Sequence, residues 1–372
     1  MKASIHLGTV WGIPIGLHVS WFLVFGLVLF SLSSGYFPAE YPGLSMIWHV
    51  ALAAVTTVLF FGSVQLHELG HALLALRNRL PVRGITLFIF GGVAQIGREP
   101  QTAGAEFRIA IAGPLVSLGL SAFFGVTYLL DQQIPYLAAP SLYLMRINLM
   151  LALFNMIPGF PLDGGRVLRA IVWKLTGSYQ RATQLASASG QLVAFGFIGW
   201  GVYTVFTGEF LNGLWLAFIG WFLQNAAASA GQQVSLQEQL RGITVAQAMS
   251  RDAAYIPALT PLSQLVQERV LGRGQHTFFV TDFAGQAVGL LTLQEITRVP
   301  QVAWRTRTAG QAMTPLAQLR SFEAGEDLLA VIQAMEEAEI PQAAVVSQGQ
   351  PVGLISHEQA QRYLQMKTQL GM

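Results

Sequence analysis

Two histidines and a glutamate lie within five residues of one another, inside an apolar run over residues 46–76. The cluster reads His67-Glu68-Leu69-Gly70-His71. On a helix, residues four apart share a face, so both imidazoles can reach one zinc ion while Glu68 lies beside it as general base. Ionisable groups in a segment long enough to cross a bilayer usually mark function. The alternative is that the two histidines and the glutamate are hydrogen-bonded within a helix bundle.

A catalytic zinc ion also needs a third protein ligand and an open position. Asp163 is the candidate, because it is the only carboxylate between Asp131 and Glu209. Prolines and glycines break the helix just before it, and irregular backbone at membrane depth is tolerated where it lines a cavity. The alternative is that Asp163 caps a helix over 164–174. Asn155 either donates to a developing oxyanion or satisfies carbonyls freed by the nearby prolines.

The composition is that of a membrane protein, but it is uneven along the chain. Of 372 residues, 53% are hydrophobic and 11% charged. Residues 1–230 hold 11 Lys/Arg and 7 Asp/Glu, whereas residues 231–372 hold 10 and 12. The chain has no cysteine, so a metal must use histidine and carboxylate ligands. A net charge of +2 without a basic cluster gives no nucleic-acid footprint.

The apolar runs within residues 1–230 predict about six membrane-spanning helices, whose orientation follows from the basic residues between them. The segments 77–108 and 166–181 are basic, whereas 35–45, 131–140 and 208–209 contain no Lys or Arg. The protein is therefore predicted to lie in a bacterial-type plasma membrane or its equivalent, with both termini in the cytoplasm. His67 then lies about 15 Å from the cytoplasmic end of its helix. The apolar runs are near 16–34, 46–76, 108–130, 141–157, 185–207 and 210–229.

Between the second and third spans, residues 83–98 contain two apolar, β-rich stretches that flank Gly91-Gly92. Each stretch is too short to span, so the pattern predicts a membrane-associated β-hairpin. A protease needs its peptide extended, and a strand edge near the metal could bind it by strand addition. The alternative is a hairpin that only packs on the membrane surface.

With these motifs the sequence resembles the site-2 protease family of intramembrane zinc metalloproteases. The resemblance rests on H-E-L-G-H over 67–71 and N-x-x-P-x-x-P-L-D-G-G over 155–165, and covers residues 1–230. It implies one Zn²⁺ per chain and a membrane-spanning protein as substrate. It further implies that His67, His71 and Asp163 are the zinc ligands, Glu68 the catalytic glutamate and Asn155 a substrate contact.

A third motif of that family is matched with one departure. Ala112-Gly113-Pro114 agrees with the small-residue motif of the third span, but Ser117 stands where many members carry asparagine. We expect this departure to affect helix packing rather than chemistry.

After a polar linker over 231–242, the chain repeats itself with an offset of 64 residues. Residues 244–250 return as 308–314, and residues 288–292 return as 352–356. Two similar halves bury a face against each other, which predicts one pseudo-symmetric α/β unit. It resembles a tandem pair of cystathionine-β-synthase-type (CBS) modules, with repeats over 243–303 and 304–368.

Such pairs often bind adenine nucleotides such as ATP or AMP. The matching motif places glycine at 289 and 353, but the ribose-binding aspartate is Glu295 in one copy and Gln359 in the other. Glutamate still accepts two hydroxyl bonds, whereas glutamine loses the charge. Nucleotide binding and a purely structural or homodimerising role both stay open. The candidate nucleotide residues are Gly289, Thr292, Glu295, Gly353 and Ser356.

The fold class is thus a polytopic α-helical membrane domain with a short β-hairpin, followed by a cytoplasmic tandem CBS domain. The function predicted is a zinc metalloendopeptidase that cuts membrane-spanning segments near the cytoplasmic side and is regulated or positioned by its tandem module. One alternative is a transporter or channel carrying the same module, which would show paired broken helices. The other is a member that binds membrane proteins without cutting them.

Overall fold

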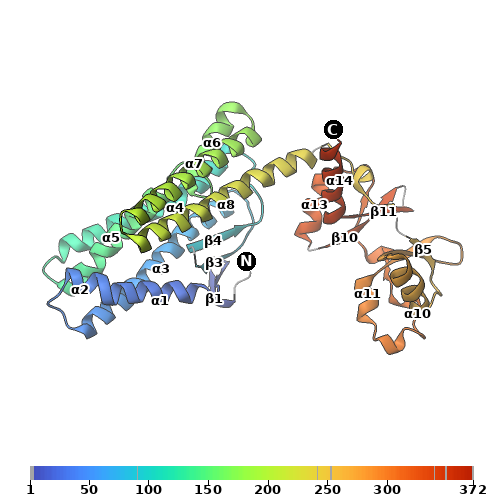
Figure 1. Ribbon diagram of the computed structural model, residues 1–372, viewed down its shortest axis with the longest axis horizontal. Helices are drawn as coiled ribbons and strands as arrows, with labels where there is room; N and C mark the ends of the chain where they lie inside the picture. Colours follow the sequence, from blue (N-terminus) through green and yellow to red (C-terminus); the bar gives the residue numbers. More distant parts are fainter. Residues whose placement is uncertain are drawn as a thin grey trace. The chain divides into compact units, whose positions relative to one another are not determined.

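The computed structural model describes residues 4–89, 91–240, 242–251, 254–338, 340–347 and 350–370. It divides into two compact units, Met1–Val234 and Ser235–Met372. The first holds long apolar helices and one sheet, and the second holds two small sheets with short helices (Figure 1).

Five helical segments of the first unit are long and apolar enough to cross a membrane, as expected for an integral membrane domain. The sixth predicted span, 210–229, is helical as well and forms the first part of α8. The helices are α1 (Trp21–Ser31), continued by a π-helical turn (Leu32–Tyr36) and α2 (Phe37–Glu40), then α3 (Met46–Arg77), α4 (Ala103–Leu130), α5 (Pro135–Asn155), α6 (Asp163–Thr176), α7 (Tyr179–Phe206) and α8 (Phe210–Leu240).

Helix α4 lies at the centre of this unit and packs against α3, α5 and α6. Small residues permit the close approach of α3 and α4. A Cβ at Gly70 would lie 2.9 Å from a methyl group of Val116 and 3.2 Å from the carbonyl oxygen of Ala112. The helix that carries the histidine cluster is thereby held directly against α4.

A four-stranded sheet with the order β1-β2-β3-β4 accompanies the helices. The predicted hairpin is confirmed: β3 (Val82–Phe88) pairs antiparallel with β4 (Gly91–Ile96). The two glycines open β4 rather than lying between the strands, and Phe90 lies outside the described residues. A second hairpin, β1 (Ile5–Val10) with β2 (Ile13–Leu17), was not predicted, and β2 joins β3 in parallel.

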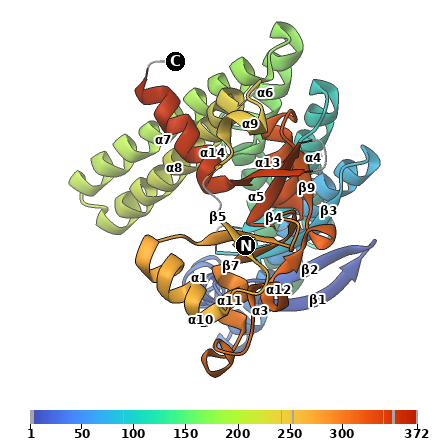
Figure 2. The ribbon, with the colours of Figure 1, turned by 90° about the vertical axis from the view of Figure 1, so that its right-hand side faces the viewer.

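The second unit consists of two similar halves that exchange their opening segments. The first sheet has the order β5-β6-β7-β8 and the second β11-β10-β9, the latter in orange to red in Figure 2. Helix α9 (Val245–Ala248) packs in the core of the half that contains β9, β10 and β11. Ala309 of α12 (Ala309–Ala312) packs in the core of the half that contains β5, β6 and β7. The two sequence copies, 243–303 and 304–368, are therefore not the two spatial halves.

The strands of the second unit are β5 (Ala254–Pro257), β6 (Thr277–Thr281), β7 (Ala287–Thr292), β8 (Thr314–Pro315), β9 (Ser321–Glu323), β10 (Gln342–Ser347) and β11 (Gln350–Ser356). Its other α-helices are α10 (Leu262–Leu265), α11 (Leu293–Arg298), α13 (Leu328–Glu337) and α14 (His357–Gln369). The predicted linker over 231–242 is largely helical, because α8 continues to Leu240; Arg241 lies outside the described residues.

Candidate metal centre

Three ligand-type atoms from two helices meet at one point in the first unit. The Nε2 atoms of His67 and His71 on α3 lie 3.2 Å apart. Oδ2 of Asp163, the first residue of α6, lies 3.2 Å from the former nitrogen and 3.1 Å from the latter. Both histidines are buried. The structure thus brings together residues 96 positions apart in the chain.

The other nitrogen of each imidazole is held by α4. Nδ1 of His71 donates to the carbonyl oxygen of Ile109 at 2.7 Å, and Nδ1 of His67 lies 2.9 Å from Oγ of Ser117. A histidine that donates through Nδ1 leaves the Nε2 lone pair free for a metal. The expectation that Ser117 matters only for helix packing is therefore wrong, because its hydroxyl contacts the imidazole of a candidate ligand.

Gly113 gives the two imidazoles their space. A Cβ at this position of α4 would lie 2.2 Å from Nε2 of His71 and 2.6 Å from Nε2 of His67. The next residue, Pro114, has no N–H to bond the carbonyl of the preceding turn. The small-residue motif of the third span thus contacts the centre directly.

The broken segment before α6 places Asp163. The residue capping α6 is Leu162, and no side chain caps this end, so the alternative reading of Asp163 as the cap is wrong. Gly164 and Gly165 let the preceding loop fold back onto the helix, since a Cβ at either would lie 2.4 Å from loop backbone atoms. The amide of Phe160 donates to the carbonyl of Ala186, which ties this loop to α7.

Glu68 faces the sheet beside the histidines. Its Oε2 accepts a hydrogen bond from the backbone N–H of Ala94 in β4 at 3.2 Å. A Cβ at Gly92 would lie 2.4 Å from Cγ of Glu68, so β4 approaches the carboxylate closely because of this glycine. Gly91 has φ of +121°, a backbone conformation that glycine adopts without strain.

Asn155 is the last residue of α5 and is half-buried. Its amide nitrogen donates to the carbonyl oxygen of Leu151 at 3.0 Å, one helical turn earlier. This contact agrees with the prediction that the amide of Asn155 satisfies a backbone carbonyl. A contact with substrate stays a prediction.

A buried ion pair joins α6 to α4, and the sequence alone gave no sign of it. Nε of Arg169 donates to Oε1 of Glu106 at 2.6 Å; Glu106 is 0% exposed and Arg169 7%. The guanidinium also lies 4.9 Å from the ring centre of Phe160 and 4.7 Å from that of Tyr179. Because α6 carries Asp163 and α4 carries Gly113, this pair positions the helix of one ligand against the helix that contacts the two imidazoles.

Breaking this ion pair from one side is expected to be costly. Arg169→Leu leaves the carboxylate of Glu106 buried and unpaired, which destabilises a fold by about 3–5 kcal/mol. The double variant Glu106→Leu/Arg169→Leu removes both charges and should recover most of that loss. Lys174→Leu, at an exposed position of the same helix, is the control. Equal unfolding free energies in detergent for the single and double variants would contradict the role.

In the second unit, the candidate nucleotide residues lie in matching places of the two halves. A Cβ at Gly289 would meet Sδ of Met313 at 2.3 Å, and one at Gly353 would meet Sδ of Met249 at 2.9 Å. Oε2 of Glu295 accepts from the backbone N–H of Thr292 at 2.9 Å and contacts its hydroxyl, which forms a capping box at α11. Oγ of Ser356 accepts from the backbone N–H of Gln359 at 3.2 Å. In this conformation the side chains of Glu295 and Ser356 thus accept hydrogen bonds from backbone groups of the second unit itself.

The three atoms at the centre have the separation that zinc requires. Tetrahedral ligands at about 2.0–2.2 Å from a zinc ion lie about 3.4 Å from one another. The observed separations of 3.1–3.2 Å are close to this value, and both imidazoles present Nε2 to the common point. Two neutral imidazoles and one carboxylate also form a known donor set for catalytic zinc.

Known proteins match this chain over both units. A family model described as peptidase family M50 matches residues 55–138 and 131–197. A chain of Synechocystis sp., provisionally named a zinc metalloprotease, is 37% identical over 366 residues, 95% of this chain and 94% of the relative. A site-2 protease from Methanocaldococcus jannaschii is 32% identical and covers 61% of this chain and 94% of its own, with a TM-score of 0.41. A CBS domain of a membrane protein from Sphaerobacter thermophilus is 16% identical and covers 37% and 96%, with a TM-score of 0.31.

The family model includes both signatures on which the resemblance rested, residues 67–71 and 155–165. The Synechocystis relative extends that likeness over nearly the whole chain. This chain therefore belongs to peptidase family M50, the site-2 protease family of intramembrane zinc metalloproteases.

Proposed function

We propose that His67, His71 and Asp163 hold the zinc ion of this metalloprotease and that Glu68 is its catalytic acid–base group. The observation that carries the proposal is the meeting of the three ligand atoms within 3.1–3.2 Å of one another beside Glu68. The substrate is a membrane-spanning protein cut near the cytoplasmic side.

A bound zinc ion lowers the pKa of a water molecule and polarises the scissile carbonyl. Glu68 accepts the proton of the attacking water and passes it to the amide nitrogen that leaves. The backbone N–H of Ala94 orients the carboxylate for both transfers. The carbonyl of Ile109 can only accept, so it keeps His71 in the tautomer that a metal needs, and the hydroxyl of Ser117 can accept from Nδ1 of His67 in the same tautomer.

The sheet offers a place for the extended substrate next to Glu68. Strand β4 is the last strand in the order β1-β2-β3-β4, so one of its edges has no strand partner among the described residues. Because Ala94 and Gly92 of this strand contact Glu68, a peptide added to that edge would pass the carboxylate. This supports strand addition at β4 over a hairpin that only packs on the membrane surface.

The first test is metal analysis of purified protein with proteolysis of a helical test substrate in parallel. We expect one zinc per chain in the wild type, and loss of both metal and cleavage in His67→Ala and Asp163→Ala. Stoichiometric zinc in either variant would refute the ligand assignment. A wild-type protein without metal would favour the transporter alternative.

The proposal also includes an orientation, with both termini and the second unit in the cytoplasm. The basic segments 77–108 and 166–181 support it through the positive-inside rule. We assign the cutting of the substrate to residues 1–230, and the regulation or positioning of the enzyme to the repeats 243–303 and 304–368. Among the described residues of the first unit, one helix end is broken by prolines and glycines, the segment before Asp163, whereas transporters show such segments in pairs.

We further propose that the second unit binds an adenine nucleotide, with a homodimer through this unit as the competing role. Gly289, Thr292 and Glu295 match the nucleotide motif in one half, whereas the other half lacks the carboxylate at Gln359. A ligand at about 100 times its Kd stabilises a fold by about 2.7 kcal/mol. ATP or AMP should therefore raise the unfolding temperature, and Glu295→Ala should abolish the shift. No shift with either nucleotide, together with a dimer in solution, would favour the structural role.

A further inference from the structure

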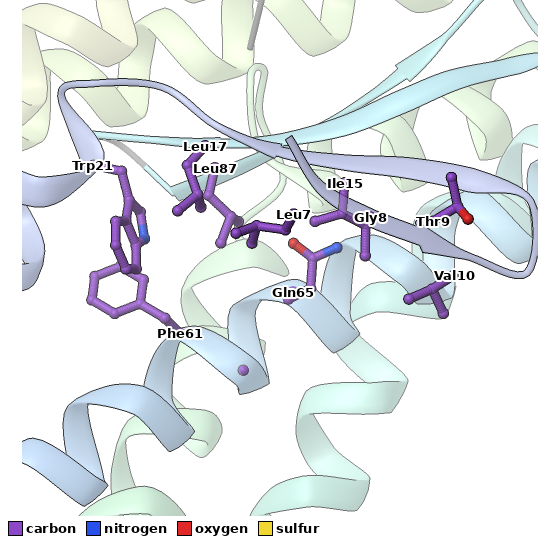
Figure 3. Close-up of a pocket in the computed structure, with 11 residues that line it drawn as sticks. Leu7, Gly8, Thr9, Val10, Ile15, Leu17, Trp21, Phe61, Gln65 and Leu87 are labelled. Atoms are coloured by element: carbon purple, nitrogen blue, oxygen red, sulfur yellow. The ribbon is translucent and has the colours of Figure 1, made fainter. Parts of the chain in front are cut away.

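The first unit contains a cavity of about 440 Å³ between the β1–β2 hairpin and helices α1 and α3 (Figure 3). Its walls are mainly apolar, with Leu7, Ile15 and Leu87 from three different strands. A ligand site adds to such walls a few polar groups that fix the ligand, whereas both amide atoms of Gln65 in this wall are buried. The cavity therefore identifies no particular ligand, and a surface of the second unit indicates its partner more clearly.

The loop that joins α11 to α12, residues 298–307, presents three arginines and a large apolar side chain to solvent. Arg298, Arg305 and Arg307 are exposed, and none of them forms an ion pair with a described residue. Val302 is 92% exposed. We call residues 298–307 the arginine loop.

The arginine loop is held in place by the core beneath it. Trp304 is half-buried against the hydrophobic core that contains Leu262, and its Nε1 donates to the carbonyl oxygen of Val299 at 2.9 Å. The backbone N–H groups of Leu262 and Ser263 in α10 donate to the carbonyl oxygens of Arg307 and Trp304, both at 3.0 Å. The arginines therefore project from a fixed backbone, so binding does not have to order the loop first.

Charge is distributed unevenly over the second unit. Residues 254–320 hold six Lys/Arg and three Asp/Glu, whereas residues 321–372 hold two and seven. At the repeat offset of 64 residues, Arg305 corresponds to Gln369 in the other copy. The repeated fold itself does not require this arginine, so the gathering of positive charge on one half indicates a negatively charged partner.

Anionic lipid head groups match both features of the arginine loop. The cytoplasmic leaflet carries a negative surface potential that attracts basic segments, and an exposed apolar side chain can enter the boundary between head groups and acyl chains. A nucleic acid gains nothing from an exposed valine, and residues 298–307 expose no aromatic side chain on which a base could stack. Residues 231–242 join the unit to the last predicted span, which gives it a high effective concentration beside the membrane.

We propose that the arginine loop docks the second unit on anionic lipid head groups of the cytoplasmic leaflet. Arg298, Arg305 and Arg307 contact the lipid phosphates, and Val302 enters the boundary with the acyl chains. The inference uses the proposed orientation of the chain but not the zinc chemistry. Each basic residue near such a surface is worth about fivefold in affinity, so three arginines shift the equilibrium between docked and free states about 100-fold.

The absence of cysteine from the chain allows a probe at a single position. Val302→Cys, labelled with a polarity-sensitive fluorophore, is placed as the full chain in nanodiscs of phosphatidylcholine, or of an equal mixture of phosphatidylcholine and phosphatidylglycerol. We expect an apolar environment only in the mixed nanodiscs, and its loss in about 1 M salt, where charges are screened beyond about 3 Å. Gln333→Cys, exposed on α13 of the other half, is the matched control and should report water in both.

A charge variant tests which residues produce the docking. Replacing all three arginines of the loop by glutamine should return the probe at Val302→Cys to water. Arg362→Gln/Lys367→Gln removes positive charges from α14 instead and should leave the signal unchanged. Every variant should keep the zinc content and the unfolding temperature of the wild type, because none of the replaced side chains is buried.

The possible results separate the partners. A probe at position 302 that reports water in the mixed nanodiscs, or an apolar environment that persists without the three arginines, would overturn the proposal. A signal that follows the number of chains per nanodisc rather than the lipid charge would assign the loop to a contact between two copies. A signal that requires added single-stranded DNA would assign it to nucleic acid. The zinc centre is tested separately by the metal analysis, so either proposal can fail alone.

Discussion

Glu68→Gln is expected to abolish cleavage while zinc remains bound. The substitution keeps the volume of the side chain, and its amide oxygen can still accept from the N–H of Ala94, but the amide cannot carry the proton of the attacking water. Loss of a general acid–base group lowers the rate by about 10²–10⁴-fold. The measurement is turnover of a helical test substrate in detergent or liposomes, with zinc analysis of the same preparation.

Glu40→Gln provides the matched control, since this carboxylate is exposed at the end of α2. It should leave both turnover and zinc content unchanged. A Glu68→Gln enzyme with wild-type turnover would remove Glu68 from the mechanism, although the ligand assignment could stand. Loss of zinc in that variant would instead show that the carboxylate is needed to form the centre.

Much of the centre is predictable from sequence because its ligands lie in local patterns. The spacing of His67 and His71 follows from the helical repeat, and Asp163 is identified by the scarcity of carboxylates in the apolar part. What holds them in place is not local. Ser117 lies 50 positions from His67, and Arg169 lies 63 positions from Glu106, so no spacing rule connects them. In the sequence pattern, Arg169 is only one of the positive charges of the basic segment 166–181.

The unpredicted β1–β2 hairpin has a different cause. A short continuous apolar run fits a strand as well as the beginning of a span, and the run near 16–34 predicts a span. The structure places residues 13–17 in β2 and begins α1 at Trp21. Gly12, with φ of +80°, forms the turn before β2 and is a sequence signal that could have indicated a hairpin.

The sequence repeat also does not predict that the two halves of the second unit exchange their opening segments. Self-similarity at an offset of 64 residues establishes that two copies exist, but not which copy each segment packs on. Val245 lies in one sequence copy and is buried against residues of the other, such as Leu328. The packing is decided by which apolar face each opening segment covers, and this depends on the tertiary structure.

Gly113→Ala is expected to destroy the metal centre with a single added methyl group. Its Cβ would lie 2.2 Å from Nε2 of His71 and 2.6 Å from Nε2 of His67, far inside van der Waals contact. Neither imidazole can retreat freely, because both are buried and are held through Nδ1 by Ile109 and Ser117. Disturbing the groups that orient metal ligands costs 10–100-fold in affinity, and a direct clash with the ligand atoms should reach at least about 100-fold.

Gly119→Ala makes the same chemical change six residues further along α4, where a Cβ would meet nothing within 4 Å. Replacing an exposed helical glycine by alanine stabilises a helix by about 0.5–1 kcal/mol. The control should therefore keep its zinc and its activity and unfold at a slightly higher temperature. Zinc affinity measured by competition with a chelator separates the two variants. If Gly113→Ala binds zinc as the wild type does, the imidazoles do not meet over Gly113, and the geometry proposed for the centre is wrong.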